Sequence, residues 1–138
     1  MKKLLIVLVI LLGGFVTAFT VSASSFYEES VAAGPFEDVV SAIKQGDINS
    51  LSRYLDNNVE INISGKANSY SKAQAEIILK DFFSKNQVKS FELVHQGGEG
   101  SRFGIGTLTT SGGNYRLSFF LQKKGGSMVL NELRFENK

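Results

Sequence analysis

Hydrophobic residues recur at helical spacing in three segments of the first half of the chain. Over residues 35–45 the apolar side chains fall at positions i, i+3, i+4 and i+7, so they share one face of a helix. Asp47 is a good N-cap for a second, short helix. Ser71 and Gln74 have the spacing of a capping box and open a third amphipathic segment over residues 71–86. The pattern therefore predicts three helices.

The spacing of apolar residues changes from helical to alternating in the second half of the chain. A first strand is predicted earlier, over residues 59–63, and residues 65–69 are expected to be a loop. Four more strands are predicted over about residues 88–96, 102–110, 114–123 and 127–136, and the glycine-rich segments between them are short enough for hairpins. The residues expected to face the core are Phe91, Leu93, His95, Phe103, Ile105, Thr107, Tyr115, Leu117, Phe119, Leu121, Val129, Leu133 and Phe135. The predicted fold class is α+β, in the order α-α-β-α-β-β-β-β, with helices covering one face of an antiparallel sheet.

The N-terminus has the pattern of an export signal. Two lysines precede the apolar run Leu4–Leu12, and Val21 and Ala23 supply the small residues that a signal peptidase requires. We therefore expect a signal peptide over residues 1–23 and a periplasmic or secreted protein. An uncleaved membrane anchor is the alternative, because no charged residue follows the lysines before Glu28.

Composition narrows the chemistry that this exported protein can use. Residues 24–34 are expected to be a flexible lead-in, and residues 35–138 to form one domain. The chain has no cysteine, which excludes disulfides, thiol nucleophiles, Cys-ligated metals and the attachment of a bacterial lipid. Without the two lysines of the signal, 13 of the 15 basic residues remain against 13 acidic ones. This neutral balance argues against a nucleic-acid partner, and membrane contact is expected only through an uncleaved signal.

The predicted elements and several short strings together indicate a family. The stretch Phe36–Asp47, the segment Leu51–Ile63, the helix over residues 71–86 and the closing four strands resemble the nuclear transport factor 2-like (cystatin-like) superfamily. More narrowly, AIKQGD, YLDNNVEI and LNELRFE are similar to strings in a family of short exported Bacteroidota proteins known only as a domain of unknown function. The resemblance implies a cone, in which a long curved sheet wraps around three N-terminal helices. It implies no particular chemistry, because fold alone does not determine function.

Few residues of this cone are suited to catalysis. The resemblance implies that an enzyme would place carboxylate, Tyr or His side chains inside the cone, yet no such pair has a characteristic spacing here. We expect no catalytic set, no metal site and no cofactor, and a single histidine without cysteine is a poor basis for zinc. Gly104 and Gly106 are expected to mark a bend in a strand, because no helix follows them to bind a phosphate. The residues expected to line the cone are Phe82, Phe91, Phe103, Phe119, Tyr54 and His95.

The opposite face of the sheet is the more suggestive surface. The residues expected to form an apolar patch there, bordered by arginine and glutamate side chains, are Val94, Leu108, Phe120 and Leu130. Such a patch is typical of an association site, and relatives of this fold often dimerise through the sheet; the alternative is apolar residues scattered among ion pairs. Three functions stay open. The preferred one is a non-catalytic module that binds a small apolar ligand or a protein partner, and the others are a small-substrate enzyme (isomerase, dehydratase or hydrolase type) and a structural envelope subunit.

Overall fold

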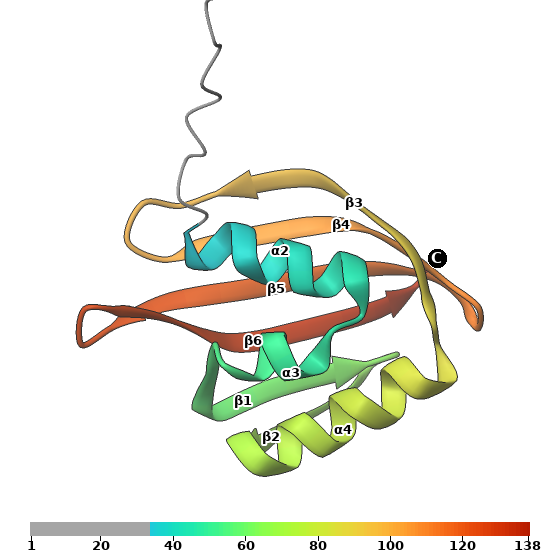
Figure 1. Cartoon of the computed structure of the whole chain (residues 1–138), viewed down its shortest axis with the longest axis horizontal. Coiled ribbons are helices and arrows are strands. Elements are labelled where there is room, and N and C mark those ends of the chain that lie inside the picture. Colours follow the sequence, from blue (N-terminus) through green and yellow to red (C-terminus); the bar gives the residue numbers. More distant parts are fainter. Residues whose placement is uncertain (1–33) are drawn as a thin grey trace, which may run out of the picture. The chain divides into compact units, whose positions relative to one another are not determined.

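The computed structural model describes residues 34–138, so the predicted signal peptide and most of the lead-in lie outside the described residues. The helices and strands, shown in Figure 1, are α2 (Pro35–Gln45), α3 (Ile48–Ser52), β1 (Leu55–Ile63), β2 (Lys66–Ser71), α4 (Lys72–Lys85), β3 (Val88–Gly97), β4 (Arg102–Thr110), β5 (Gly113–Lys124) and β6 (Ser127–Asn137). No helix in this range is long and apolar enough to cross a membrane.

All six strands belong to one sheet, in the order β2-β1-β6-β5-β4-β3. Strands β3 to β6 form an antiparallel meander, whereas β1 pairs with β6 in parallel. The three helices lie across one face of this curved sheet (Figure 1). The predicted α+β class is thus confirmed. We call the sheet face opposite the helices the outer face.

One expected loop is a strand. Residues 65–69 lie largely within β2, which pairs with β1 across a tight turn at Ser64 and Gly65. Both turn residues have positive φ, 52° and 86°, as a two-residue hairpin requires. The prediction was wrong because β2 is an edge strand whose side chains are nearly all exposed, so it shows no alternation of apolar and polar residues.

The helix ends follow the local sequence signals. The capping box is present at the start of α4, where the Ser71 side chain accepts from the Gln74 N–H and the Gln74 side chain accepts from the Ser71 N–H, both at 3.3 Å. Asp47 caps α3 by accepting from the Ser50 N–H at 3.1 Å. The hydrogen bonds from Ser50 lower the pKa of Asp47. These bonds satisfy backbone donors that would otherwise lack a partner in the first turn.

Phenylalanine rings fill the space between the helices and the sheet. The buried members are Phe36, Phe82, Phe83, Phe91, Phe119 and Phe135. The ring centroids of Phe82 and Phe135 are 4.4 Å apart, and those of Phe36 and Phe119 are 5.5 Å apart. Such distances are those of directly packed aromatic pairs. These rings form the aromatic core, and buried valine, isoleucine, leucine and alanine side chains surround it.

Candidate functional site

The strand β4 faces the opposite way from the sequence-based expectation. Gly104, Gly106 and Leu108 are buried and face the helices, whereas Phe103 and Ile105 are half-buried on the outer face. The physical reason is the space occupied by rings on the neighbouring strands. A Cβ atom added to Gly104 would lie 2.4 Å from Cζ of Phe119, so any larger residue there would force the ring of Phe119 or the strand to shift. The expected core-facing set on β4 was wrong.

His95 also lies on the outer face. The pairing of β3 with β4 shifts register between Leu93 and His95, and His95 then lies opposite Ile105. This bulge turns the imidazole away from the helices, because one extra residue reverses the side on which the next side chain points. The His95 ring is 5.5 Å from the ring of Phe103. The structure therefore places both residues outside the core that they were expected to line.

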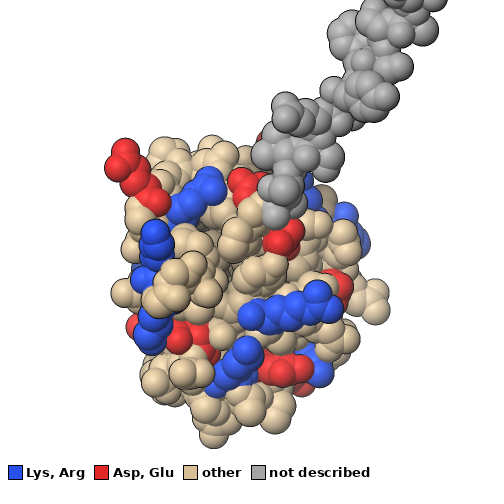
Figure 2. All heavy atoms as spheres, turned by 60° about the vertical axis from the view of Figure 1, so that its left-hand side comes forward, with Lys and Arg blue, Asp and Glu red and all other residues tan. Residues whose placement is uncertain are grey.

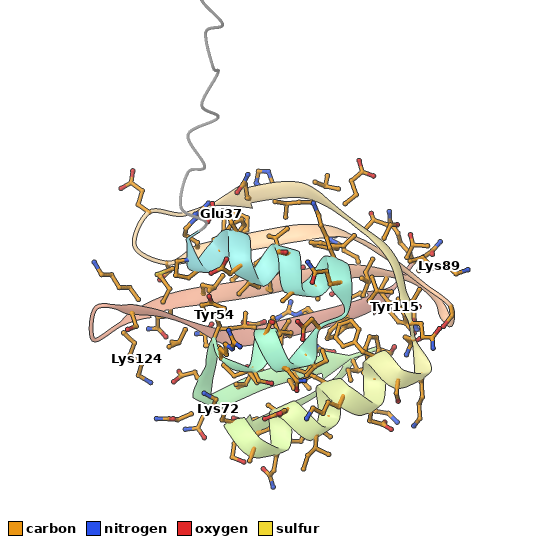
Figure 3. All side chains as sticks on the ribbon, viewed as in Figure 1. Glu37, Tyr54, Lys72, Lys89, Tyr115 and Lys124 are labelled. Atoms are coloured by element: carbon orange, nitrogen blue, oxygen red, sulfur yellow. The ribbon has the colours of Figure 1, made fainter. Side chains whose placement is uncertain are left out.

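The other residues expected to line the cone lie on the helix side of the sheet. Phe82, Phe91 and Phe119 are buried in the aromatic core. Tyr54 lies just past the end of α3 (Figure 3), and its hydroxyl donates to the carboxylate of Asp38 at 2.5 Å. The structure brings these phenylalanines together but leaves Tyr54 half-buried at the periphery of the core.

Two of the four expected interface residues are buried instead. Leu108 and Leu130 are both 0% exposed and belong to the core. Leu108 follows the reversed orientation of β4, and Leu130 precedes a register shift between β5 and β6 that leaves Asn131 unpaired. Val94 is 69% exposed at the β3 bulge, and Phe120 is half-buried. Of the four, only Val94 and Phe120 lie on the surface of the outer face, where a partner could contact them.

An aromatic cluster, which we call the outer aromatic patch, occupies the outer face of β3, β4 and β5. It consists of His95, Phe103, Ile105 and Phe120. Phe103 pairs with Phe120 across β4 and β5, and their ring centroids are 6.3 Å apart. Sequence reasoning missed this patch because it assigned three of the four residues to the core. The register of the β4–β5 hairpin, which pairs Phe103 with Phe120, would have placed β4 correctly, and the bulge in β3 accounts for His95.

Acidic and basic residues lie next to the outer aromatic patch on the outer face. On β6, Glu132 lies opposite Phe120 and Arg134 lies opposite Ser118. Arg134 donates to Glu132 at 2.7 Å, yet its Nε atom is buried without a hydrogen-bond partner within residues 34–138. Farther along, Arg116 of β5 lies opposite Glu136. The outer face thus combines an apolar half with a charged half of mixed sign.

Two shallow clefts hollow this face. One of about 320 Å³ borders Phe103, Phe120 and Glu132. The other, of about 390 Å³, borders Val94, His95 and Arg116 and is mostly apolar. Concave apolar surface of this kind can receive side chains of another molecule.

A polar cleft beside the helices contains a hydrogen-bonded aspartate and tyrosine. Asp38 and Tyr54 lie in an open cleft of about 220 Å³ together with Arg53 and two serines. The hydrogen bond to Asp38 raises the pKa of the Tyr54 phenol, so this group is a weaker acid than free tyrosine. No cluster of three or more His, Asp or Glu side chains that could hold a metal occurs in residues 34–138.

Some of the other charged side chains form ion pairs. Figure 2 shows acidic and basic side chains interspersed over one side of the domain. Lys124, which the sequence places at a hairpin tip, lies 3.2 Å from both carboxylate oxygens of Asp56. Lys80 and Glu76 form an ion pair of 3.0 Å on α4. A surface pair such as Lys80–Glu76 contributes little to stability, about 0–1 kcal/mol.

A curved sheet that packs against three helices is the NTF2-like fold. A crystal structure of an NTF2-like protein from Cytophaga hutchinsonii superposes with a TM-score of 0.55 at 10% identity, covering 75% of this chain and 92% of that one. This likeness concerns the fold alone. It confirms the resemblance that the sequence suggested.

Within this class, residues 36–136 match the family described as Domain of unknown function (DUF4783), and the chain belongs to that family. A crystal structure of a DUF4783 family protein from Bacteroides uniformis is similar at 35% identity, with a TM-score of 0.72, and covers 74% of this chain and 95% of that one. Another, from Bacteroides fragilis, is 37% identical, with a TM-score of 0.70, and covers 73% and 96%. A comparison with curated proteins found no match.

Proposed function

We propose that this protein is a non-catalytic association domain that pairs with a second copy of itself through the outer aromatic patch. The observation that carries the proposal is the position of the aromatic side chains. Phe103 and Phe120 remain half-buried on the outer face, whereas the phenylalanines on the helix side of the sheet are buried in the core. Aromatic residues at the centre of a patch are typical of protein interfaces.

The charges beside the patch support a second copy as the partner. Arg116 and Arg134 lie on the same face as Glu132 and Glu136. A two-fold pairing places the same surface against itself, so an arginine of one copy can meet a glutamate of the other.

The proposed place of action is the periplasm or the outside of the cell. This part of the proposal rests on the pattern of an export signal, which the sequence predicts over residues 1–23. The absence of cysteine throughout the chain is compatible with an exported domain that is held together by its core.

The test is the substitution Phe120→Asp in the protein purified as its host produces it. We expect the unchanged protein to sediment as a dimer at micromolar concentration. Replacing an aromatic anchor by a charge should weaken association at least about 30-fold, equivalent to about 2 kcal/mol, and yield monomers. The control is Ile77→Asp, because Ile77 is 67% exposed on α4, away from the outer face.

Circular dichroism of both variants establishes that they are folded. A folded Phe120→Asp variant that still sediments as a dimer would exclude the outer aromatic patch as the interface. An unchanged protein that stays monomeric at all concentrations up to several hundred micromolar would refute self-association.

A further inference from the structure

A groove on the helix side of the sheet lies between α4 and the β1–β2 hairpin. It encloses about 340 Å³, within the lower range of small-molecule sites. Ile61 and Phe82, both buried, form its floor. Ile63, Tyr70 and Ile78 form its walls and are only half-buried. The groove therefore leaves apolar surface accessible to a ligand.

The chain connectivity explains why this groove is open. β2 ends at Ser71 and α4 starts at Lys72, so the strand and the helix adjoin at this junction and diverge from it. The groove lies between them beyond that junction and reaches Lys66 at the hairpin and Lys85 at the end of the helix. Because β2 is an edge strand, no further strand or helix of residues 34–138 closes this side.

The polar groups along the groove favour an anion. Lys66 and Asn68 border it on β2, and Asp81 and Lys85 border it on α4. Asp81 is the one acidic residue among these, and Lys85 Nζ already binds its carboxylate at 3.1 Å. Lys66 makes no ion pair within residues 34–138, so its ammonium group adds an uncompensated positive charge.

We infer that this groove binds an amphipathic carboxylate. The apolar body of the ligand lies against Ile63, Tyr70 and Ile78, and its carboxylate lies at Lys66, with the Asn68 amide as a second donor. An ammonium group and an amide provide charge-assisted hydrogen bonds to a carboxylate. The groove is separate from the outer aromatic patch, so the inference does not depend on the proposed function.

Decanoate, used as the free monomeric acid anion, is a suitable probe for isothermal titration calorimetry with the protein purified from its host. We expect saturable binding with one site per chain. Lys66→Gln should weaken decanoate binding about five-fold, as expected for the loss of a partly exposed ion pair. Lys72→Gln is the matched control, because Lys72 is also an exposed lysine but lies at the first residue of α4, outside the groove lining (Figure 3), and it should leave the affinity unchanged.

A neighbouring pair of isoleucines tests the apolar part of the site. Ile78 lines the groove, whereas Ile77 is 67% exposed elsewhere on the same helix. Ile78→Ala should weaken decanoate binding about ten-fold through the lost apolar contact, and Ile77→Ala should have no effect. Sedimentation of the four variants should match that of the unchanged protein, which separates this test from that of the outer aromatic patch.

Three results would overturn the inference. The first is an absence of saturable decanoate binding. The second is equal affinity for decanoate and decanol, which would show that the carboxylate is not recognised. The third is an equal loss of affinity in Lys66→Gln and Lys72→Gln. That result would show that the net charge of the protein, and not a contact at Lys66, determines the affinity for decanoate.

Discussion

The substitution Gly104→Ala tests the orientation of β4, on which the outer aromatic patch depends. Gly104 faces the core, and an added Cβ would lie 2.4 Å from Cζ and 2.6 Å from Cε1 of Phe119. Both distances are far below van der Waals contact. The ring of Phe119 is 0% exposed and packs against Phe36 and Phe91, so it has little room to move away.

The expected loss of stability follows from two opposing effects. Adding a methyl group to a well-packed core costs about 1–3 kcal/mol. Replacing glycine by alanine also restricts the unfolded chain, which offsets about 0.4–1 kcal/mol of this loss. We therefore expect Gly104→Ala to lower the free energy of unfolding by about 1–2 kcal/mol. At about 4–8 °C per kcal/mol for a domain of this size, the fall in Tm is readily measured.

Urea denaturation followed by circular dichroism is the assay. Gly100→Ala is the control, because nothing lies within 4 Å of a Cβ added there, and it should be at least as stable as the unchanged protein. In a Phe119→Leu background the colliding ring atoms are gone, so the additional cost of Gly104→Ala should shrink markedly. If Gly104→Ala is as stable as Gly100→Ala, Phe119 does not cover Gly104 and the reasoning on β4 fails.

Two further predictions concern hydrogen bonds on the helix side of the domain. Tyr54→Phe removes the bond to Asp38 and should cost about 1 kcal/mol at neutral pH. Because folding raises the pKa of Tyr54 above its ordinary value of 10.0, this stabilisation is complete below pH 10 and is lost as the pH rises through the folded-state pKa. Above pH 10 the free energy of unfolding of the unchanged protein should therefore fall more steeply than that of Tyr54→Phe. Urea denaturation at a series of pH values measures both, and an equal fall in the two proteins would contradict the prediction. Ser71→Ala removes half of the α4 capping box and should lower the free energy of unfolding by about 1 kcal/mol. Thermal denaturation measures this loss. Ser69→Ala, an exposed serine on β2, is its control, and an equal Tm for the two variants would show that the cap contributes nothing.

The sequence by itself determined the features that depend on near neighbours in the chain. The helix over residues 35–45 and the capping box at Ser71 were confirmed because apolar spacing and side-chain bonds to the backbone act within a few residues. The last four strands and the glycine-rich hairpins between them were predicted nearly to their ends for the same reason. The strand β2 was missed because an exposed edge strand needs no apolar alternation.

Only the tertiary structure decided which side of the strands forms the core and where the surface patch lies. Period-two alternation shows which residues share a face of a strand, but not which face is buried. On β4 that choice depends on rings of other strands, since Phe119 occupies the space over Gly104 and leaves Phe103 on the outside. On β3 and β6 the buried side depends on bulges. The bulge in β3 turns the His95 side chain to the outer face, and the bulge in β6 places Leu130 in the core. Bulges and ring packing join residues distant in the chain, so local patterns do not determine them.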